Sequence, residues 1–399
     1  MAQVRPFRAL RPRDDFAAAV IAPPYDVLTE DEARAIATER RSFVRVTRSE
    51  VDLPIGADPH SDAAYLRARE NLDGFVADGV LVRDDQPTFY FYGQVMGDHH
   101  QVGLLAGCSV EEYDDGRIAK HEYTRPDKED DRTHHMDVLD AQVGLVFLAY
   151  RPTERLTALT AELTAGPPAW EVRTEDGVIH RLWPAPPARA SDLRAAFEEV
   201  PKLYVADGHH RSAAASRIHA QRKDEATAWF LCGLYPSDRL QVLPYNRVVH
   251  DLNGLEPSGL LARLAPAFEL VDPGQDRPSR KGTFSMYLDG RWITLVARPH
   301  IMSTDPVAGL DVSILQDQVL GPLLGITDPR RSERITFVGG IRGTRALTDR
   351  VDHAGGVAFH LFPTSLDELF AVADAGQVMP PKSTWFEPKL REGVVVRSL

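Results

Sequence analysis

The sequence predicts a mixed α/β (α+β) fold in a larger two-domain or three-part chain. Short β-rich runs alternate with segments of helical spacing along the whole length, and no period of about 20–50 residues recurs, which argues against a solenoid or propeller. At 399 residues the chain is longer than one ordinary domain. We expect an N-terminal α/β domain over 1–150, a central region over 151–251 and a C-terminal α/β region over 252–399.

The composition is that of a folded and mildly acidic chain. Lys and Arg total 46 against 58 for Asp and Glu, a formal net charge of −12. A general nucleic-acid binder carries a basic excess instead, so we expect no nucleic-acid partner. Hydrophobic residues make up 43% and charged residues 26% of the chain, as in soluble globular domains.

The sequence favours a cytoplasmic location. The arginines near the N-terminus are not followed by the apolar run of a signal peptide, and no stretch approaches the roughly 18 apolar residues of a membrane span, so no membrane partner is expected. Cys108 and Cys232 lie in apolar, strand-like runs, and we expect both to be buried rather than reactive. The oligomeric state is not indicated.

The N-terminal region predicts helices and strands in a clear order. Thr29, followed by three acidic residues, is a typical helix N-cap. Two β-rich runs around the polar break MGDHH predict a hairpin, and a continuous apolar run predicts a buried strand. The expected helices are 29–39 and 63–77, and the expected strands are 87–95, 101–110 and 142–150.

The central region repeats this alternation. Prolines and small residues interrupt it after a first helix and again before a second one. The expected helices are 154–164 and 192–199, and the expected strands are 170–174, 178–183 and 227–236.

A glycine-containing turn separates a strand predicted over 202–206 from an alanine-rich helix predicted over 212–221. Its residues are Asp207, Gly208, His209, His210 and Arg211. A glycine between strand and helix permits a tight turn whose free amides and helix dipole favour an anion. The arginine adds a planar, bidentate donor for phosphate or carboxylate.

This turn matches none of the common nucleotide fingerprints. Neither a Walker A motif nor the Rossmann glycine pattern is present. Asp207 is suited to orienting a histidine or to holding Mg²⁺. The alternative is an ordinary helix start, in which Asp207 caps the helix and the histidines are solvated. A zinc site made by His209 and His210 is disfavoured, because adjacent residues seldom chelate one metal.

The segment YVADGHHRSAAA at 204–215 resembles the hallmark of the domain of unknown function 1015 family. Further segments resemble the same family in its order: APPYDVL at 22–28, KHEYTRPDKEDDR at 120–132, LDVSILQDQVLGPLLGI at 310–326 and MPPKSTWFEPKL at 379–390. The turn also resembles the phosphate-binding motif of the ParB/sulfiredoxin superfamily, which includes free serine kinases. This resemblance implies a ParB/sulfiredoxin-like element that holds the phosphates of ATP or ADP, with Mg²⁺, at Gly208, His209, His210 and Arg211.

The polar cluster at 120–132 is either a solvated loop, as most charge runs are, or part of a site. The family resemblance marks five of its residues: His121, Glu122, Thr124, Lys128 and Arg132. Glu122 is our candidate general base and His121 the second candidate. The family usually has a short aliphatic residue after the Asp-Arg pair, where Thr133-His134 stands here.

Two proline-bracketed segments are further candidates. Lys382, Ser383 and Thr384 offer an ammonium group and two hydroxyls to a phosphate, whereas the aromatic residues that follow are expected to pack. Tyr25 and Asp26 follow two prolines and are either presented to a ligand by a rigid turn or packed at a corner under the core.

The leading hypothesis is a nucleotide-dependent phosphotransferase that acts on a small hydroxyl-bearing metabolite, in the class of serine or a related hydroxy amino acid. In it Glu122 accepts the hydroxyl proton, Mg²⁺ meets Asp207, and three cations, Lys128, Arg132 and Lys382, stabilise phosphoryl oxygens.

Two alternatives stay open. The first is a non-catalytic nucleotide-binding regulator of the ParB type. The second is a metal-dependent hydrolase or lyase with His121, His209 and His210 as ligands.

Overall fold

The computed structural model describes residues 2–399, which form two compact units. Unit 1 holds the described residues up to Leu240 together with Pro388–Leu399, and unit 2 holds Gln241–Glu387. The chain therefore leaves unit 1 and returns to it for its last residues. Both units contain sheets and helices, and the mixed α/β class expected from the sequence is confirmed.

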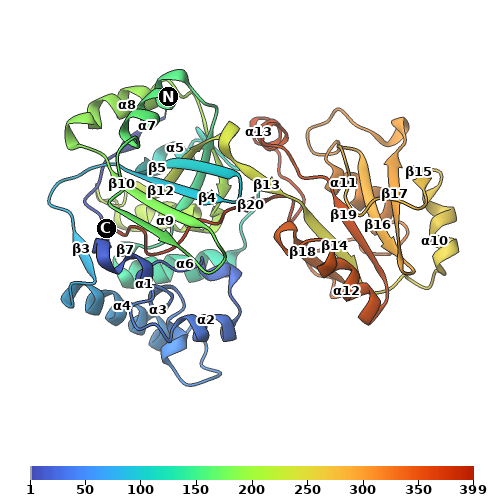
Figure 1. Ribbon diagram of the computed structural model, residues 1–399, viewed down its shortest axis with the longest axis horizontal. Coiled ribbons are helices and arrows are strands. Elements are labelled where there is room, and N and C mark those ends of the chain that lie inside the picture. The colour runs from blue at the N-terminus through green and yellow to red at the C-terminus, as the bar shows by residue number, and fades with distance from the viewer. Residues whose placement is uncertain (1) are drawn as a thin grey trace. The chain divides into compact units, whose positions relative to one another are not determined.

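Unit 1 is built on a nine-stranded sheet in the order β6-β11-β8-β12-β5-β4-β10-β9, with β1 also paired to β5 (Figure 1). Only the pairs β6/β11 and β8/β12 are parallel. The strands are β1 (Val4–Arg5), β4 (Tyr90–Met96), β5 (His99–Ser109), β6 (Ile118–Ala119), β8 (Val146–Tyr150), β9 (Trp170–Arg173), β10 (Ile179–Pro184), β11 (Leu203–Asp207) and β12 (Trp229–Pro236).

This sheet joins segments that the sequence assigns to different regions. β8, at the end of 1–150, lies between β11 and β12 of 151–251. The compact unit consequently runs through position 150, because cutting there would separate hydrogen-bonded neighbours in the middle of a sheet. Two short pairs complete the strands of unit 1: β2 (Leu10–Pro12) with β3 (Leu81–Arg83), and β7 (Ala141–Gln142) with β21 (Arg397–Ser398).

The helices of unit 1 surround this sheet. In Figure 1 the blue helices α2, α3 and α4 group together, away from the green α7 and α8. The helices are α1 (Ala17–Val20), α2 (Glu30–Ile36), α3 (Val44–Thr47), α4 (Asp62–Ala77), α5 (Val110–Asp114), α6 (Pro126–Leu139), α7 (Glu154–Leu163), α8 (Ala190–Phe197) and α9 (His209–Arg222).

Most elements follow the expectations from local pattern. α2 begins after Thr29, whose hydroxyl accepts the backbone N–H of Glu32 in a capping box. The expected hairpin is β4 and β5, with Gly97 at positive φ in its turn. The exception is α6, because the polar cluster at 120–132 continues into a helix that begins at Pro126.

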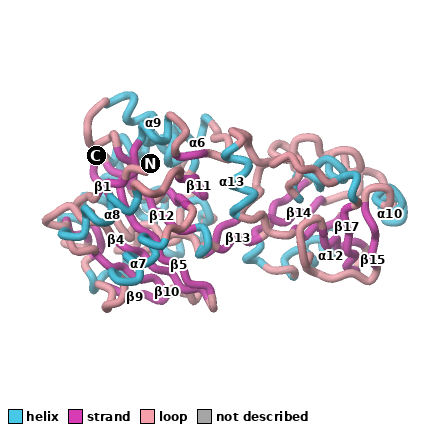
Figure 2. The backbone as a smooth tube through the Cα atoms, turned by 90° about the horizontal axis from the view of Figure 1, so that it is seen from above, coloured by secondary structure: helices cyan, strands magenta, loops and turns pink. Residues whose placement is uncertain are grey.

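Unit 2 contains an antiparallel six-stranded sheet in the order β15-β17-β16-β19-β14-β18; strands are magenta in Figure 2. A separate pair joins β13 (Gln241–Leu243) to β20 (Trp385–Glu387). The sheet strands are β14 (Tyr245–Val249), β15 (Phe268–Val271), β16 (Thr283–Leu288), β17 (Arg291–Ala297), β18 (Ile335–Gly339) and β19 (Val357–Leu361). The helices are α10 (Pro257–Leu264), α11 (Asp311–Leu315), α12 (Arg345–Ala354) and α13 (Leu366–Asp374).

The core of unit 1 includes both cysteines. Cys108 and Cys232 are fully buried on β5 and β12, so the expectation that both are buried is confirmed. Burial raises the pKa of the Cys232 thiol well above its ordinary value. Over residues 2–399, none of the helices has the length and apolar character that crossing a bilayer requires.

Candidate functional site

The turn between β11 and α9 has the strand–glycine–helix form that the sequence predicts. Gly208 adopts a left-handed conformation, with φ of 95°, and α9 begins at the next residue. A Cβ atom at this position would lie 2.9 Å from Arg211 Nε and 3.3 Å from Val146 Cα. Glycine is therefore required both by the backbone angle and by the side chain that folds over it.

Asp207 is held by groups on either side of this turn. Its Oδ2 lies 3.0 Å from Lys389 Nζ, and its Oδ1 accepts the backbone N–H of Gly208 at 2.8 Å. Arg211 Nη2 lies 4.0 Å from the same Oδ1. Burial disfavours the charged carboxylate, but the two cations outweigh it and hold the pKa of Asp207 well below its usual range. An Mg²⁺ ion at Asp207 would therefore have to compete with both cations.

The two adjacent histidines, His209 and His210, are the first residues of α9 and point to different neighbours. The rings of His209 and His121 have centroids 4.6 Å apart and meet edge to face at 86°. His210 Nε2 instead accepts the backbone N–H of Arg125 at 3.2 Å, just before α6. Burial lowers the pKa of all three rings, to about 4 for His121, so they are neutral near pH 7.

Glu122 joins the pair formed by His121 and His209. One ligand-type atom from each of the three residues lies within 4.8 Å of the others. The histidines are buried and the glutamate is exposed, so the group lies at the surface end of the turn. Both residues that we predicted as candidate bases are thus brought beside the start of α9.

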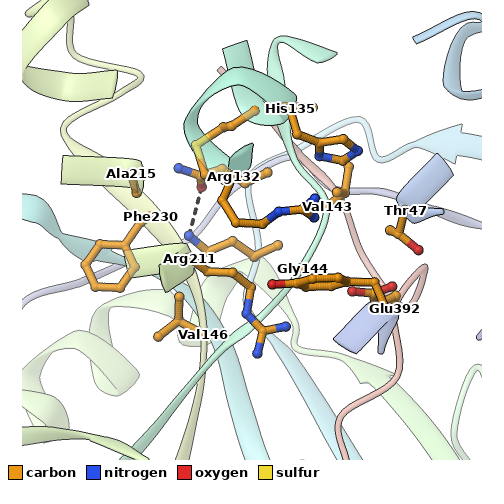
Figure 3. Close-up of a pocket in the computed structure, with 15 residues that line it drawn as sticks. Thr47, Arg132, His135, Val143, Gly144, Val146, Arg211, Ala215, Phe230 and Glu392 are labelled. Carbon is orange, nitrogen blue, oxygen red and sulfur yellow. Dashed lines mark hydrogen bonds between the residues drawn. The ribbon is translucent and has the colours of Figure 1, made fainter. Parts of the chain in front are cut away.

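A second set of polar groups surrounds a cavity of about 30 Å³ inside unit 1 (Figure 3). Figure 3 shows Arg132 from α6, Arg211 from α9 and Glu392 from the C-terminal segment around this one cavity. The remaining lining residues are Tyr25, Thr47, His135, Met136, Ala141, Gln142, Val143, Gly144, Val146, Ala215, Phe230 and Leu231. Three predicted segments, 22–28, 120–132 and 204–215, therefore each contribute a side chain to one cavity.

Arg132 is fixed in the cavity wall by two contacts. Its Nη2 pairs with Asp131 Oδ2 at 2.7 Å, and its Cζ lies 4.2 Å from the ring centroid of Tyr25. Burial raises the pKa of Tyr25 to about 12, so the phenol stays a neutral hydrogen-bond donor. This part of the cavity therefore presents hydrogen-bond donors.

Glu392 is the main cavity residue that the sequence did not reveal. Its side chain is 3% exposed, and burial raises its pKa to about 7 although the charge of Arg211 opposes the change. Glu392 Oε2 and Arg211 Nε have no hydrogen-bond partner within residues 2–399. A carboxyl that titrates near neutrality beside two guanidinium groups is able to exchange a proton with a small polar ligand.

The other predicted site residues lie outside this cavity. Lys128 is on the first turn of α6, near enough to His210 for its charge to lower the pKa of that ring. Lys382, Ser383 and Thr384 belong to unit 2. There the carbonyl of Lys382 accepts from Arg247 Nη2 at 3.1 Å, and Ser383 Oγ donates to the carbonyl of Pro380 at 2.6 Å. Their role in phosphate binding stays a prediction.

Several solved structures resemble the chain at low sequence identity. SbnI with a C-terminal truncation, from Staphylococcus aureus, is similar over 72% of this chain and 84% of its own, at 10% identity and a TM-score of 0.39. Free serine kinase in complex with AMP is similar over 71% and 86%, at 12% identity and a TM-score of 0.35. A conserved hypothetical protein from Pyrococcus furiosus is similar over 71% of this chain and 90% of its own, at 10% identity and a TM-score of 0.35. No curated protein sequence matches.

The family comparison covers most of the chain. Residues 4–313 match the family described as "Protein of unknown function (DUF1015)". The three segments that meet at the cavity all lie within this range, whereas 379–390 lies beyond it. With more than half of its 399 residues matched, the chain belongs to the DUF1015 family.

Proposed function

We propose that this protein is a phosphotransferase that moves a phosphoryl group from ATP or ADP to a small hydroxyl-bearing metabolite. One observation carries the proposal: Arg132 and Arg211, from separate segments of the chain, line one cavity with the buried carboxyl of Glu392. Two guanidinium groups beside a carboxyl of pKa about 7 provide charge stabilisation and a proton acceptor in one place.

The start of α9 is suited to hold the phosphates of the donor. The first amides of a 14-residue helix have no partners within the helix, and its dipole favours a negative charge. Arg211 extends from the first turn of the helix over Gly208 and lines the cavity. Phosphoryl transfer depends mainly on positioning and on charge stabilisation, which are the properties these groups supply.

The size of the cavity limits the acceptor. About 30 Å³ accommodates one or two water-sized groups, such as a hydroxymethyl group, but not a nucleobase. In this proposal the acceptor's hydroxyl enters the cavity and the nucleoside stays outside it.

Two carboxyls are candidates for the general base. Glu122 lies at the start of α9 next to two histidines, and Glu392 lies in the cavity itself. We favour Glu392, because a pKa near 7 matches the operating pH and because the group lines the same cavity as the two arginines. In this proposal the exposed Glu122 is not the general base.

The test is nucleotide turnover with a panel of hydroxy amino acids. ATP and ADP are each incubated with the full-length chain and one acceptor, with and without Mg²⁺, and nucleotide consumption and the phosphorylated product are measured. We expect turnover with a serine-sized acceptor, and a decrease in kcat/KM of about 10²–10³-fold in Arg211→Lys and Arg132→Lys. Arg217→Ala removes an arginine of α9 that pairs with the exposed Asp130 of α6; it is the control and should retain activity.

The same assay distinguishes Glu392 from Glu122 as the general base, and a phosphotransferase from a non-catalytic regulator. Glu392→Gln should abolish turnover, whereas loss in Glu122→Gln alone would assign the base to Glu122. Nucleotide binding without turnover of any acceptor would favour a non-catalytic regulator. If no nucleotide raises the melting temperature and Arg211→Lys changes nothing, the proposal is wrong.

A further inference from the structure

We propose that His121, Glu122 and His209 form a binding site for a divalent transition-metal ion such as Zn²⁺. One donor atom from each residue lies within 4.8 Å of the other two. Ligands of one Zn²⁺ ion, with bonds of about 2.0–2.1 Å, are separated by roughly 3–3.5 Å. Small rotations of three side chains are therefore enough to bring the donors to one ion.

Both imidazoles present a buried nitrogen that the protein does not satisfy. His121 is 2% exposed and His209 is 5% exposed. His121 Nδ1 and His209 Nε2 have no hydrogen-bond partner anywhere in residues 2–399. A buried nitrogen without a partner is unfavourable, and one metal ion bound by both rings would satisfy the two nitrogens together.

The ring of His121 is oriented as a metal ligand usually is. The ring hydrogen-bonds to the backbone of Val205, and because Nδ1 is unpartnered, this bond is made by Nε2. Donation of one ring N–H to a backbone carbonyl fixes the tautomer and turns the lone pair of the other nitrogen toward the ion. In His121 the other nitrogen is Nδ1, which has no partner within residues 2–399.

The donor set selects the class of ion. Two imidazoles and one carboxylate suit Zn²⁺, Co²⁺, Fe²⁺ or Mn²⁺ better than Mg²⁺, which prefers oxygen ligands. Three protein ligands leave at least one position open for a water or an anionic oxygen. Neighbouring groups are engaged elsewhere: Asp207 pairs with Lys389, and His210 accepts from the backbone of Arg125.

The site shares the start of α9 with the proposed phosphate site, but binding of the metal requires no nucleotide. The experiment is calorimetric titration of the EDTA-treated, dialysed full-length chain with Zn²⁺, followed by metal analysis of the purified complex. We expect one Zn²⁺ per chain, no comparable binding of Mg²⁺, and a visible absorption band when Co²⁺ replaces Zn²⁺. The metal titration does not depend on kinase activity. Absence of phosphotransfer would not change the measured Zn²⁺ binding, and absence of Zn²⁺ binding would not exclude phosphotransfer.

Variants test the donor set. His121→Ala and His209→Ala should weaken Zn²⁺ binding by about 100-fold or more, and Glu122→Gln by about 10-fold. The control is His219→Ala, which removes a histidine of the same helix whose Nδ1 lies 3.1 Å from Thr227 Oγ1, and it should bind as the wild type does. If the histidine variants fail to fold, Glu122→Gln still carries the test, because Glu122 is exposed.

Two results would overturn the inference. One is a wild-type chain that binds neither Zn²⁺ nor Co²⁺ more tightly than Mg²⁺. The other is a pair of results: Glu122→Gln binds Zn²⁺ as tightly as the wild type, and His210→Ala loses Zn²⁺ binding. This pair would assign the site to a different set of histidines.

Discussion

Lys389 Nζ lies 3.0 Å from Asp207 Oδ2, and the two residues are 182 positions apart in the chain. Three residues after Lys389, Glu392 contributes its buried carboxyl to the cavity. The backbone of Glu392 pairs with that of Ala22: the N–H of Glu392 donates to the carbonyl of Ala22, and the N–H of Ala22 donates to the carbonyl of Glu392. The C-terminal segment of unit 1 is consequently part of the candidate site and of the turn that begins α9.

The first prediction concerns this ion pair. Lys389→Met leaves the Asp207 carboxylate, whose side chain is 30% exposed, without its nearest cation, and we expect the free energy of unfolding to fall by about 1–3 kcal/mol. Lys281→Met is the matched control, because Lys281 pairs with Glu368 while 45% exposed and should cost less than about 1 kcal/mol. Urea unfolding followed by tryptophan fluorescence measures both; equal losses would contradict a structural role for the Asp207 pair.

The sequence predicts the β11–α9 turn well because its signals are local. An apolar run, a glycine and an alanine-rich stretch follow one another, and each fixes the conformation of its own few residues. The meeting of Tyr25, Arg132 and Arg211 at one cavity was not derivable from spacing, since it depends on a sheet whose strand order brings distant segments together. The family resemblance marked the segments but not their common cavity.

Two features were missed for identifiable physical reasons. α6 carries charged residues on most of its surface, so no apolar stripe reveals it; only Pro126 and the acidic Asp127 and Glu129 in its first turn indicated a helix start. Glu392 stands beside charged residues in the sequence, where a carboxyl is normally solvated. Its burial comes from the backbone pairing with Ala22, which is not visible in the local sequence.

The second prediction concerns the glycine of the turn. Gly208→Ala combines a strained positive φ with close contacts to Arg211 and to the backbone of Val146, and we expect a loss of about 2–3 kcal/mol in unfolding free energy. Gly177→Ala is the control: its φ is 82°, but a Cβ there meets nothing within 4 Å, so only about 1 kcal/mol should be lost. Urea unfolding of both variants measures the two losses. Equal losses of unfolding free energy in Gly208→Ala and Gly177→Ala would mean that Arg211 moves aside freely.

The third prediction concerns the carboxylate behind Arg132. Tyr65 Oη donates to Asp131 Oδ1 at 2.7 Å, and His60 Nδ1 lies 2.8 Å from the same oxygen. Tyr65→Phe should lower the unfolding free energy by about 1.5–3 kcal/mol near pH 7, the range for hydrogen bonds to charged groups. Tyr287→Phe, which loses a bond to the exposed Asp352, should cost less.

The dependence of the unfolding free energy on pH in the acidic range provides a second check on Tyr65→Phe. Burial alone would raise the pKa of Asp131 above its ordinary value of 3.8. The charge of Arg132 and the hydrogen bonds that Asp131 accepts outweigh burial and lower this pKa to about 2. The stabilising contribution of this carboxylate is therefore complete above pH 3.8 and is lost as the pH falls toward 2. The difference between wild type and Tyr65→Phe should shrink over the same interval; a difference that is constant from pH 5 to pH 2 would show that the lost bond does not involve the charged form.

The fourth prediction concerns Glu392, whose pKa is raised from 4.5 to about 7 by burial. The folded protein keeps this proton up to about pH 7, whereas the unfolded chain releases it near pH 4.5. The free energy of unfolding should consequently fall as the pH rises from 4.5 to 7, by up to about 3 kcal/mol from this group. Glu392→Gln keeps the shape of the side chain but cannot ionise, so its unfolding free energy should lack this decrease.

The comparison is made by urea unfolding of wild type and Glu392→Gln at intervals between pH 5 and pH 8. Because other groups titrate equally in both proteins, the difference between the two curves isolates residue 392. We expect the variant to gain stability relative to the wild type as the pH rises, with most of the gain reached by pH 7 to 8. A difference that does not change with pH would mean that Glu392 ionises near its ordinary pKa, with the cavity arginines compensating fully for burial, and it would remove the main argument for this carboxyl as the proton acceptor.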